Sequence, residues 1–335
     1  MRIVLDAMGS DNFPRPEVEA AAQIVRSQGP NDEFILVGDE NVVGPALAAL
    51  GPAEATRRVR LVHATEMVEM AEKPAAAARS KAENSMAVGM DLVKRGEADA
   101  FVTAGNTGGA LANGLLRLGR IRGVKRPALT GPFPVRGGTT VLLDIGANAE
   151  CKPEYLLQFA ILGSVYAEAV FGIRRPRVGL LSNGEEAGKG NDLVKETFPL
   201  LAGSSLNFIG NVESKEFFNG QADVVVTDGF TGNVFLKTSE AVAQRLVEAL
   251  RDEIQSNPIT TLGGALARPA FRRVRRMLDP GEYGAAPLLG LNGLVFVAHG
   301  RSDSRALVNA VGAARRAVEG NMLDHLRSAV GSRLI

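Results

Sequence analysis

Short apolar runs, rich in β-branched residues, recur along the chain and are separated by polar or glycine-rich segments. They are too uniformly apolar for strands with one face in water, so they predict strands buried on both faces. The runs are RIVLDA, EFILVGD, VRLVHA, DAFVTA, TVLLDIGA, RVGLLS, LNFIGN, DVVVTDG and GLVFVAHG.

Between many of these runs the apolar residues recur with the helical period, as in PEVEAAAQIVRSQ and PEYLLQFAILGSVYAEAV. Alternation of strands and helices predicts an α/β fold with a largely parallel sheet and helices on both of its faces. In such folds ligands bind beyond the carboxyl ends of the strands. The loops that follow the predicted strands are therefore the places where functional residues are expected.

Two of these loops carry the same pattern. ADAFVTAGNTGGAL begins at residue 98 and ADVVVTDGFTGNVF at residue 222, and both contain T-x-G-x-T-G before a helical segment. Glycines permit close backbone approach, and threonine hydroxyls and helix-start amides can donate to an anion. The alternative is a tight turn in which threonine caps the helix. The repeat indicates two related halves, by duplication or convergence, that meet at one crevice. The candidate ligands are Asn106, Thr107, Gly108, Thr231, Gly232 and Asn233.

Other predicted strand ends carry further candidates. Asp6 and Gly9 follow the first strand, and Asn148 follows TVLLDIGA. Lys189 stands in a glycine-bounded loop, where its ammonium is suited to phosphate, although charged loop residues are also typical of solvated surface. His299 ends the last apolar run, either as a structural hydrogen-bonding residue or as a catalytic one.

Composition narrows the class of protein. The chain has 335 residues, 45% hydrophobic and 22% charged, with a formal net charge of +1, so nucleic acid is not an expected partner. We expect a cytoplasmic protein, because no signal-peptide pattern and no membrane-spanning apolar run is present. Cys151 is the single cysteine, either a thioester-forming nucleophile or a small buried hydrophobe. No metal or nucleotide motif is present, so no cofactor is expected.

One region departs from the α/β alternation. NPITTLGGALARPAFRRVRRMLD, residues 257–279, contains five arginines and predicts a helical hairpin inserted over residues 240–285, with Pro269 in the first turn of its second helix. We interpret it as a surface that contacts anionic membranes; the alternative is a dimer-packing helix with a solvated basic face. The expected membrane contacts are Leu262, Leu266, Arg268, Phe271 and Arg272.

Several segments together resemble one family, the bacterial phosphate acyltransferases, or acyl-carrier-protein:phosphate transacylases. The resemblance covers nearly the whole chain in family order. Ser10 replaces a second glycine, and the segment 301–303 alters a serine pair, which bears on any hydroxyl role beside His299. The segments are DAMGSDNFP, TAGNTGGAL, LGRIRGVKRPAL, LDIGANAECKPEYLLQFA, VGLLSNGEEAGKGN, FIGNVE, VVVTDGFTGNVFLKT and YGAAPLLGLNGLVFVAHGRSDS.

The resemblance implies a fold, a partner set and a location. The fold would be a three-layer α/β/α sandwich similar to the isocitrate and isopropylmalate dehydrogenases and phosphate acetyltransferases, with residues 1–335 forming one domain of two interleaved halves, usually a homodimer. The enzyme would move a long-chain acyl group from acyl carrier protein to inorganic phosphate. The acyl phosphate would pass to a glycerol-3-phosphate acyltransferase in phospholipid synthesis, at the inner face of the cell membrane.

The chemistry requires little acid–base help. Phosphate is largely dianionic near neutral pH, and a thiol with a pKa near 8.5 leaves readily as thiolate. Lys189 and the glycine-loop amides would hold phosphate, Asn233 would stabilise the oxyanion, and His299 would shuttle a proton or bind phosphate. Two alternatives remain at this point: a dehydrogenase of the same fold, and a non-catalytic scaffold on the membrane surface.

Overall fold

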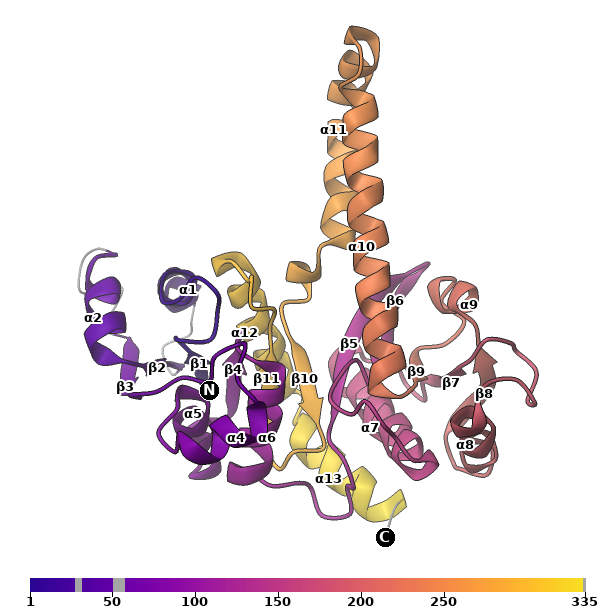
Figure 1. Ribbon diagram of the computed structural model, residues 1–335, viewed down its shortest axis with the longest axis horizontal. Coiled ribbons are helices and arrows are strands. Elements are labelled where there is room, and N and C mark those ends of the chain that lie inside the picture. The colour runs from indigo at the N-terminus through magenta and orange to yellow at the C-terminus, as the bar shows by residue number, and fades with distance from the viewer. Residues whose placement is uncertain (28–31, 51–57, 334–335) are drawn as a thin grey trace.

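The computed structural model describes residues 1–27, 32–50 and 58–333. Its strands form one sheet with helices on both faces (Figure 1). The strands are β1 (Arg2–Asp6), β2 (Glu33–Gly38), β3 (Val59–His63), β4 (Ala100–Thr103), β5 (Ala128–Val135), β6 (Gly138–Leu143), β7 (Arg177–Leu181), β8 (Asn207–Val212), β9 (Val224–Val226), β10 (Ala286–Leu289) and β11 (Leu294–Val297). The helices are α1 (Arg15–Ser27), α2 (Glu40–Ala48), α4 (Pro74–Ser80), α5 (Ser85–Lys94), α6 (Thr107–Arg117), α7 (Pro153–Phe171), α8 (Asp192–Ala202), α9 (Ser214–Phe218), α10 (Gly229–Ile254), α11 (Pro258–Leu278), the 3₁₀ helix η1 (Pro280–Glu282), α12 (Ser304–Glu319) and α13 (Met322–Arg333).

The strand order is β3-β2-β1-β4-β11-β10-β5-β6-β9-β7-β8. The first five strands in this order are mutually parallel, and so are the last four. Three antiparallel pairings, β11 with β10, β10 with β5 and β5 with β6, separate these two sets. The sheet is therefore mixed but largely parallel, as predicted, because seven of the ten strand pairings among the described residues are parallel. Because β10 and β11 return to the first set after the second is complete, the chain interleaves the two halves.

The sheet is strongly twisted, so that one face points to opposite sides of the molecule at its two ends. Side chains of α1, α7, α8 and α13 belong to one hydrophobic cluster on one face of the sheet. In Figure 1, however, α1 lies above the left half of the sheet, whereas α7, α8 and α13 lie below the right half. Neighbouring strands rotate by about 20–25°, so somewhat more than half a turn accumulates over the ten steps from β3 to β8. Since the sets also run in opposite directions, the half turn brings the carboxyl ends of both toward the same side of the molecule.

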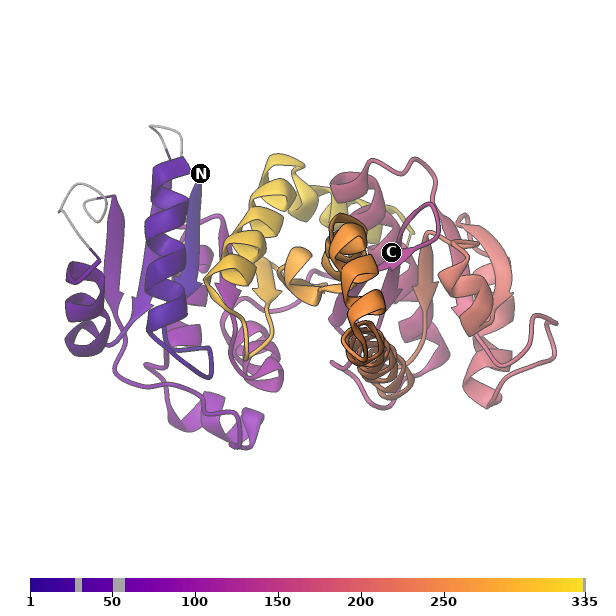
Figure 2. The same ribbon diagram turned by 90° about the horizontal axis from the view of Figure 1, so that it is seen from above.

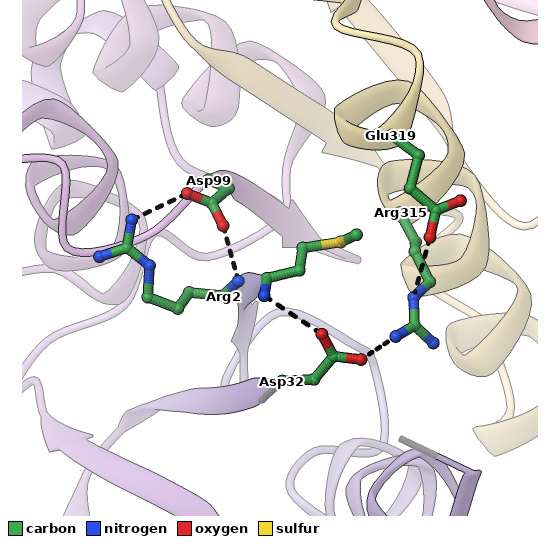
Figure 3. A network of polar contacts seen from close by, with 6 residues as sticks. Arg2, Asp32, Asp99, Arg315 and Glu319 are labelled. Atoms are coloured by element: carbon green, nitrogen blue, oxygen red, sulfur yellow. Dashed lines mark hydrogen bonds and ion pairs between the residues drawn. The ribbon is translucent and has the colours of Figure 1, made fainter. Parts of the chain in front are cut away.

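Charged residues secure the amino ends of the first set (Figure 3). Arg2 donates its backbone N–H and its guanidinium to Asp99 at 2.7 and 2.9 Å. The amino group of Met1 lies 3.1 Å from Asp32, which also pairs with Arg315 of α12. These contacts join the start of β1 to the segment before β4 and to α12, at the edge opposite to the ligand-binding loops.

The helices α10 and α11 form an antiparallel hairpin that projects far from the sheet (Figures 1 and 2). The first helix begins at Gly229, directly after β9 and earlier than the predicted residue 240. The second begins at Pro258, so Pro269 lies inside it and not, as predicted, at its start. Gly264 faces the side chain of Ile254, which lets the two helices approach closely. No side chain of α11 is buried within this chain.

Candidate functional site

The loops after β1 and β4 are joined by a buried threonine. The Thr103 hydroxyl donates to Asp6 at 2.7 Å and accepts the Gly105 N–H at 2.9 Å. A Cβ on Gly9 would lie 2.9 Å from the backbone nitrogen of Gly105, so this contact between the loops requires glycine. Asp6 is fully buried. Its carboxylate therefore orients the two loops and, in this conformation, does not reach a ligand as predicted.

A second buried carboxyl group, Glu17 in the first turn of α1, supports the same loop. It accepts the backbone N–H of Ser10 at 3.1 Å. Burial raises the pKa of Glu17 to about 7, and the negative charge of Asp6 acts in the same direction. Burial also raises the pKa of Asp6, against the opposing effect of its hydrogen bond from Thr103.

We expect Glu17→Gln to remove a pH dependence of stability. The pKa is about 7 in the folded protein against an ordinary value of 4.5, so between these values only the folded state keeps the proton. Stability present below pH 4.5 is thus lost as the pH rises to 7, by up to about 3 kcal/mol. Glutamine still accepts from Ser10 but stays neutral. In urea titrations, the free energy of unfolding of Glu17→Gln relative to the parent should be about 2 kcal/mol larger at pH 8 than at pH 5. An equal difference at both pH values would contradict the assignment.

The loop after β11 completes this group. Asp11 donates its backbone N–H to the carbonyl of Gly300 at 2.8 Å, so the loop lies beside the one that follows β1. His299 is exposed, and its Nδ1 accepts the backbone N–H of Arg301 at 3.3 Å. Its Nε2 has no hydrogen-bond partner among the described residues and can meet a ligand.

The start of α6 faces the same edge of the sheet. Asn106 caps the helix by accepting the N–H of Gly109 at 3.0 Å, so the cap is asparagine and not threonine. The amide nitrogen of Asn106 donates to backbone carbonyls of residues 69 and 70. The backbone N–H groups of Thr107 and Gly108 have no acceptor within the described ranges. Free amides at a helix start have the geometry that binds an anion.

Asp144, directly after β6, organises a second group of loops. Burial raises its pKa, and the hydrogen bonds to the carboxylate oppose that rise. The carboxylate accepts the backbone N–H groups of Leu129 (3.1 Å), Gly146 (3.1 Å), Ala147 (2.9 Å) and Asn148 (2.7 Å), and the side-chain amide of Asn148 (2.8 Å).

The second T-x-G-x-T-G segment packs on this loop. Asp228 caps α10 and accepts both the N–H and the hydroxyl of Thr231 at 2.8 Å. A Cβ on Gly232 would lie 1.9 Å from the carbonyl oxygen of Asp144, so only glycine fits there. The first N–H of α10, on Gly229, donates to the carbonyl of Asn148 at 2.8 Å, whereas the corresponding N–H of α6, on Thr107, has no acceptor among the described residues, although the two segments share one pattern.

Two predicted amide ligands lie within this second group. Asn148 donates to the carbonyl of Pro127 at 2.7 Å and to Asp144. Asn233 donates to the carbonyl of Ile145 at 2.9 Å. The Asn148 amide nitrogen uses both of its N–H groups on the protein. Asn233 uses one, and its second N–H, which has no acceptor among the described residues, can donate to an oxyanion.

Cys151 is half-buried beside Asn148, its Sγ 3.6 Å from that residue's carbonyl oxygen. Burial raises the pKa of the Cys151 thiol to about 12, and the charge of Asp144 adds to the rise. A thiol that remains protonated at neutral pH is a poor nucleophile.

The family resemblance implies direct attack of phosphate on a thioester, so we expect Cys151→Ser to keep most of the parent's acyl-transfer rate, within about threefold. The variant and the parent are compared under saturating donor and phosphate. The parent is also denatured during turnover with a radiolabelled acyl donor. Label retained on Cys151 would overturn this prediction.

Lys189 lies in the loop after β7. Asn211 of β8 donates to the carbonyl of Glu186 at 2.8 Å, and the backbone N–H of Lys189 donates to the same carbonyl at 2.9 Å. The Lys189 side chain is exposed, with no acidic partner within 4.0 Å in the described part of the chain. Its charge is therefore available to an external anion.

The predicted residues thus fall into two groups and one separate loop. No hydrogen bond or ion pair joins the groups to each other or to Lys189 within the described residues. Among those residues there is also no cluster of histidine, cysteine and acidic side chains that could hold a metal ion. The first group contains Asp6, Gly9, Asn106, Thr107, Gly108 and His299, and the second contains Asn148, Thr231, Gly232 and Asn233.

Comparison with solved structures defines the class of fold. A phosphotransacetylase from Streptococcus pyogenes aligns with a TM-score of 0.61 at 19% identity, covering 94% of both chains. A branched-chain phosphotransacylase from Enterococcus faecalis aligns with a TM-score of 0.60 at 16% identity, covering 95% of this chain and 99% of the other. The chain thus has the fold of the phosphotransacylases.

Sequence comparison gives the family. The model of the family described as "Fatty acid synthesis protein" matches residues 1–325. A phosphate acyltransferase of Elusimicrobium minutum is 49% identical over 98% of this chain and 95% of its own length, and one of Myxococcus xanthus is 48% identical over 99% and 94%. The chain belongs to the phosphate acyltransferase family and is an enzyme that transfers acyl groups to phosphate. The two alternatives, a dehydrogenase and a non-catalytic scaffold, are therefore excluded.

Proposed function

We propose that the enzyme transfers a long-chain fatty acyl group from acyl carrier protein to inorganic phosphate, giving an acyl phosphate that a glycerol-3-phosphate acyltransferase then uses. The near full-length similarity to phosphate acyltransferases carries this proposal. The test is formation of acyl phosphate from palmitoyl-acyl carrier protein in the presence of phosphate and its absence without phosphate.

In the proposed reaction, a phosphate oxygen attacks the thioester carbonyl carbon, the C–S bond breaks, and the carrier's thiolate leaves. Lys189 binds the dianion, and the free amides of Thr107 and Gly108, six strand positions away in the sheet, offer a separate anion site. Asn233 stabilises the tetrahedral oxyanion, and the exposed His299 binds phosphate or moves a proton. The high pKa of the Cys151 thiol supports direct attack without an acyl-enzyme.

We also propose that the tip of the hairpin inserts into anionic membranes at their cytoplasmic face. Ile259, Leu262 and Leu266, in the first turns of α11, are 84%, 67% and 80% exposed. No helix in the described ranges is both long and apolar enough to span a membrane. With a rise of 1.5 Å per residue, Arg268 lies about 9 Å beyond Leu262, at headgroup depth when the tip inserts. Arg272, about 15 Å beyond Leu262, and its neighbour Phe271 then reach the bilayer only if the hairpin tilts.

We propose that a second copy of the chain packs on another apolar surface of the hairpin. Val242, Leu246 and Leu250 of α10 are spaced at helical i, i+4, i+8 positions and are 53%, 59% and 52% exposed. They form one apolar stripe, about half of whose surface is left uncovered by the described residues. Two hairpins packed through this stripe would form a homodimer while leaving both tips free.

We expect the parent to float with liposomes that contain phosphatidylglycerol and not with neutral ones. Leu262→Glu combined with Leu266→Glu should lower the floated fraction at least fivefold, because two charges replace the inserted side chains. Leu116→Glu with Leu200→Glu, which changes two exposed leucines outside the hairpin, is the matched control and should float like the parent. Sedimentation should show all three proteins as dimers. Equal flotation of the hairpin variant would rule out insertion of the tip.

A further inference from the structure

The helix α11 carries five arginines in positions 268 to 276 and no acidic residue along its length. Four of them, at i, i+4, i+7 and i+8, lie on one helical face, and we call them the arginine stripe. All four are exposed, and only Arg276 forms an ion pair among the described residues, at 3.8 Å from Glu282. Their Cα positions extend over about 12 Å of the helix. The stripe consists of Arg268, Arg272, Arg275 and Arg276.

Most of the stripe lies too far from the hairpin tip to serve the membrane. Arg272 and Arg276 are about 15 and 21 Å beyond Leu262 along the helix. An inserted apolar segment penetrates only about 5–10 Å, and charges in physiological salt interact over about 8 Å. When the tip is inserted, this part of the stripe remains in water, where like charges on one face repel each other. The charge of this part of the stripe is therefore available to a different anionic partner.

The base of the stripe is fixed beside the candidate site. Glu282, just after α11, pairs with both Arg276 and Arg305 of α12. Asn309 of α12 also donates to the carbonyl of Gly281 at 2.8 Å. The helix α12 directly follows the loop 298–303, which contains the candidate histidine. Figure 1 shows α11 descending toward η1 and β10, next to α12. A molecule bound to the stripe would thus lie next to the first group of site residues.

We propose that the arginine stripe docks an acidic protein, the carrier that delivers the acyl thioester, and this rests on the proposed function. Guanidinium groups bind carboxylates through paired hydrogen bonds. A row about 12 Å long matches several carboxylates on a protein surface, whereas one phosphate ion can contact only one or two arginines. Such a surface raises the association rate and makes it sensitive to salt. Chemistry and docking are then separate: Lys189 holds phosphate, and the stripe holds the carrier.

The stripe variant reverses the charge of Arg272 and Arg275 together. The control variant combines Arg26→Glu with Arg174→Glu, an equal charge change at two exposed arginines elsewhere. Each protein is assayed with palmitoyl-acyl carrier protein and with the uncharged palmitoyl thioester of N-acetylcysteamine. The stripe variant should show a KM for the carrier substrate raised about 10-fold or more and a weaker salt dependence. Its rate with the small thioester and its flotation with anionic liposomes should equal those of the parent. The control should match the parent in every assay.

Binding of fluorescently labelled acyl carrier protein, measured by anisotropy, tests docking without turnover. Weaker binding to the stripe variant supports docking even if no acyl phosphate forms from either donor, an outcome that would refute only the proposed function. Equal loss with both donors would assign the two arginines to the chemistry. Lost flotation with an unchanged KM would assign them to the membrane. Either result, or parental behaviour throughout, would overturn the docking proposal.

Discussion

Lys189→Ala is expected to slow acyl phosphate formation by about 10²-fold or more at low phosphate, with the fold unchanged. The ammonium is exposed, is not paired with an acidic group within the described ranges, and follows the carboxyl end of β7. A phosphate dianion at this edge would lose its one preorganised point charge. The side chain is exposed and only its stem lies against Gly184, so its loss should change the melting temperature little.

The measurement is the rate as a function of phosphate concentration for the parent, Lys189→Ala and Lys189→Arg. Lys195→Ala, which removes an exposed lysine from the neighbouring helix α8, is the matched control. We expect the alanine variant at position 189 to require much more phosphate for half saturation, arginine to restore part of the affinity, and the control to follow the parent. Phosphate saturation unchanged in Lys189→Ala would exclude the role.

Asp144→Ala should have the largest effect on stability, a loss on the order of 4 kcal/mol, together with loss of activity. Four backbone N–H groups and one side-chain amide donate to this buried carboxylate. Without it, these donors lose a charged acceptor, and hydrogen bonds to charged groups contribute about 1.5–3 kcal/mol each before water compensates. The start of α10 packs on the same loop, so Asn233 would also lose its position.

Asp228→Ala is the control for this prediction, because it removes a neighbouring aspartate that only caps α10. An N-cap substitution costs about 1 kcal/mol. Free energies of unfolding from urea titrations at constant pH compare the two variants with the parent. If Asp144→Ala costs no more than Asp228→Ala, the carboxylate does not organise the loops as described.

Much of the fold follows from the apolar runs. Each predicted run contains a strand, because the apolar segments are visible directly in the sequence. The edge strands β3 and β8 are only partly covered and not, as predicted, buried on both faces. The strands β5 and β10 were not predicted, since Pro132, Pro134 and Pro287 interrupt their pattern and proline cannot donate to a strand ladder. These two strands create the antiparallel pairings that reverse the second half. Apolar patterning does not encode strand direction, so this reversal was outside what the sequence could show.

The sequence predicted the location of the candidate site better than the hydrogen bonds of its side chains. The candidate site residues outside the hairpin lie in the loops after the carboxyl ends of strands or at the starts of the helices that follow. Yet the side chains of Asp6, Asn106, Asn148 and Asn233 bond to nearby loops or helix ends. Short polar side chains readily bond to local backbone, and a sequence motif does not show whether they do so or stay free for a ligand. The role of Asp144 depends on contacts from three segments, which no local pattern reveals.

The central claim is that phosphate itself attacks the carrier-bound acyl group. Its most direct measurement follows palmitoyl-acyl carrier protein with ¹⁸O-labelled phosphate, detecting acyl phosphate by mass spectrometry and the released carrier thiol by a chromogenic reagent. We expect one acyl phosphate per thiol, all four phosphate-derived oxygens retained in the product, and no thiol release when phosphate is omitted. Release of free palmitate and thiol without phosphate, or thiol release with no acyl phosphate, would contradict it.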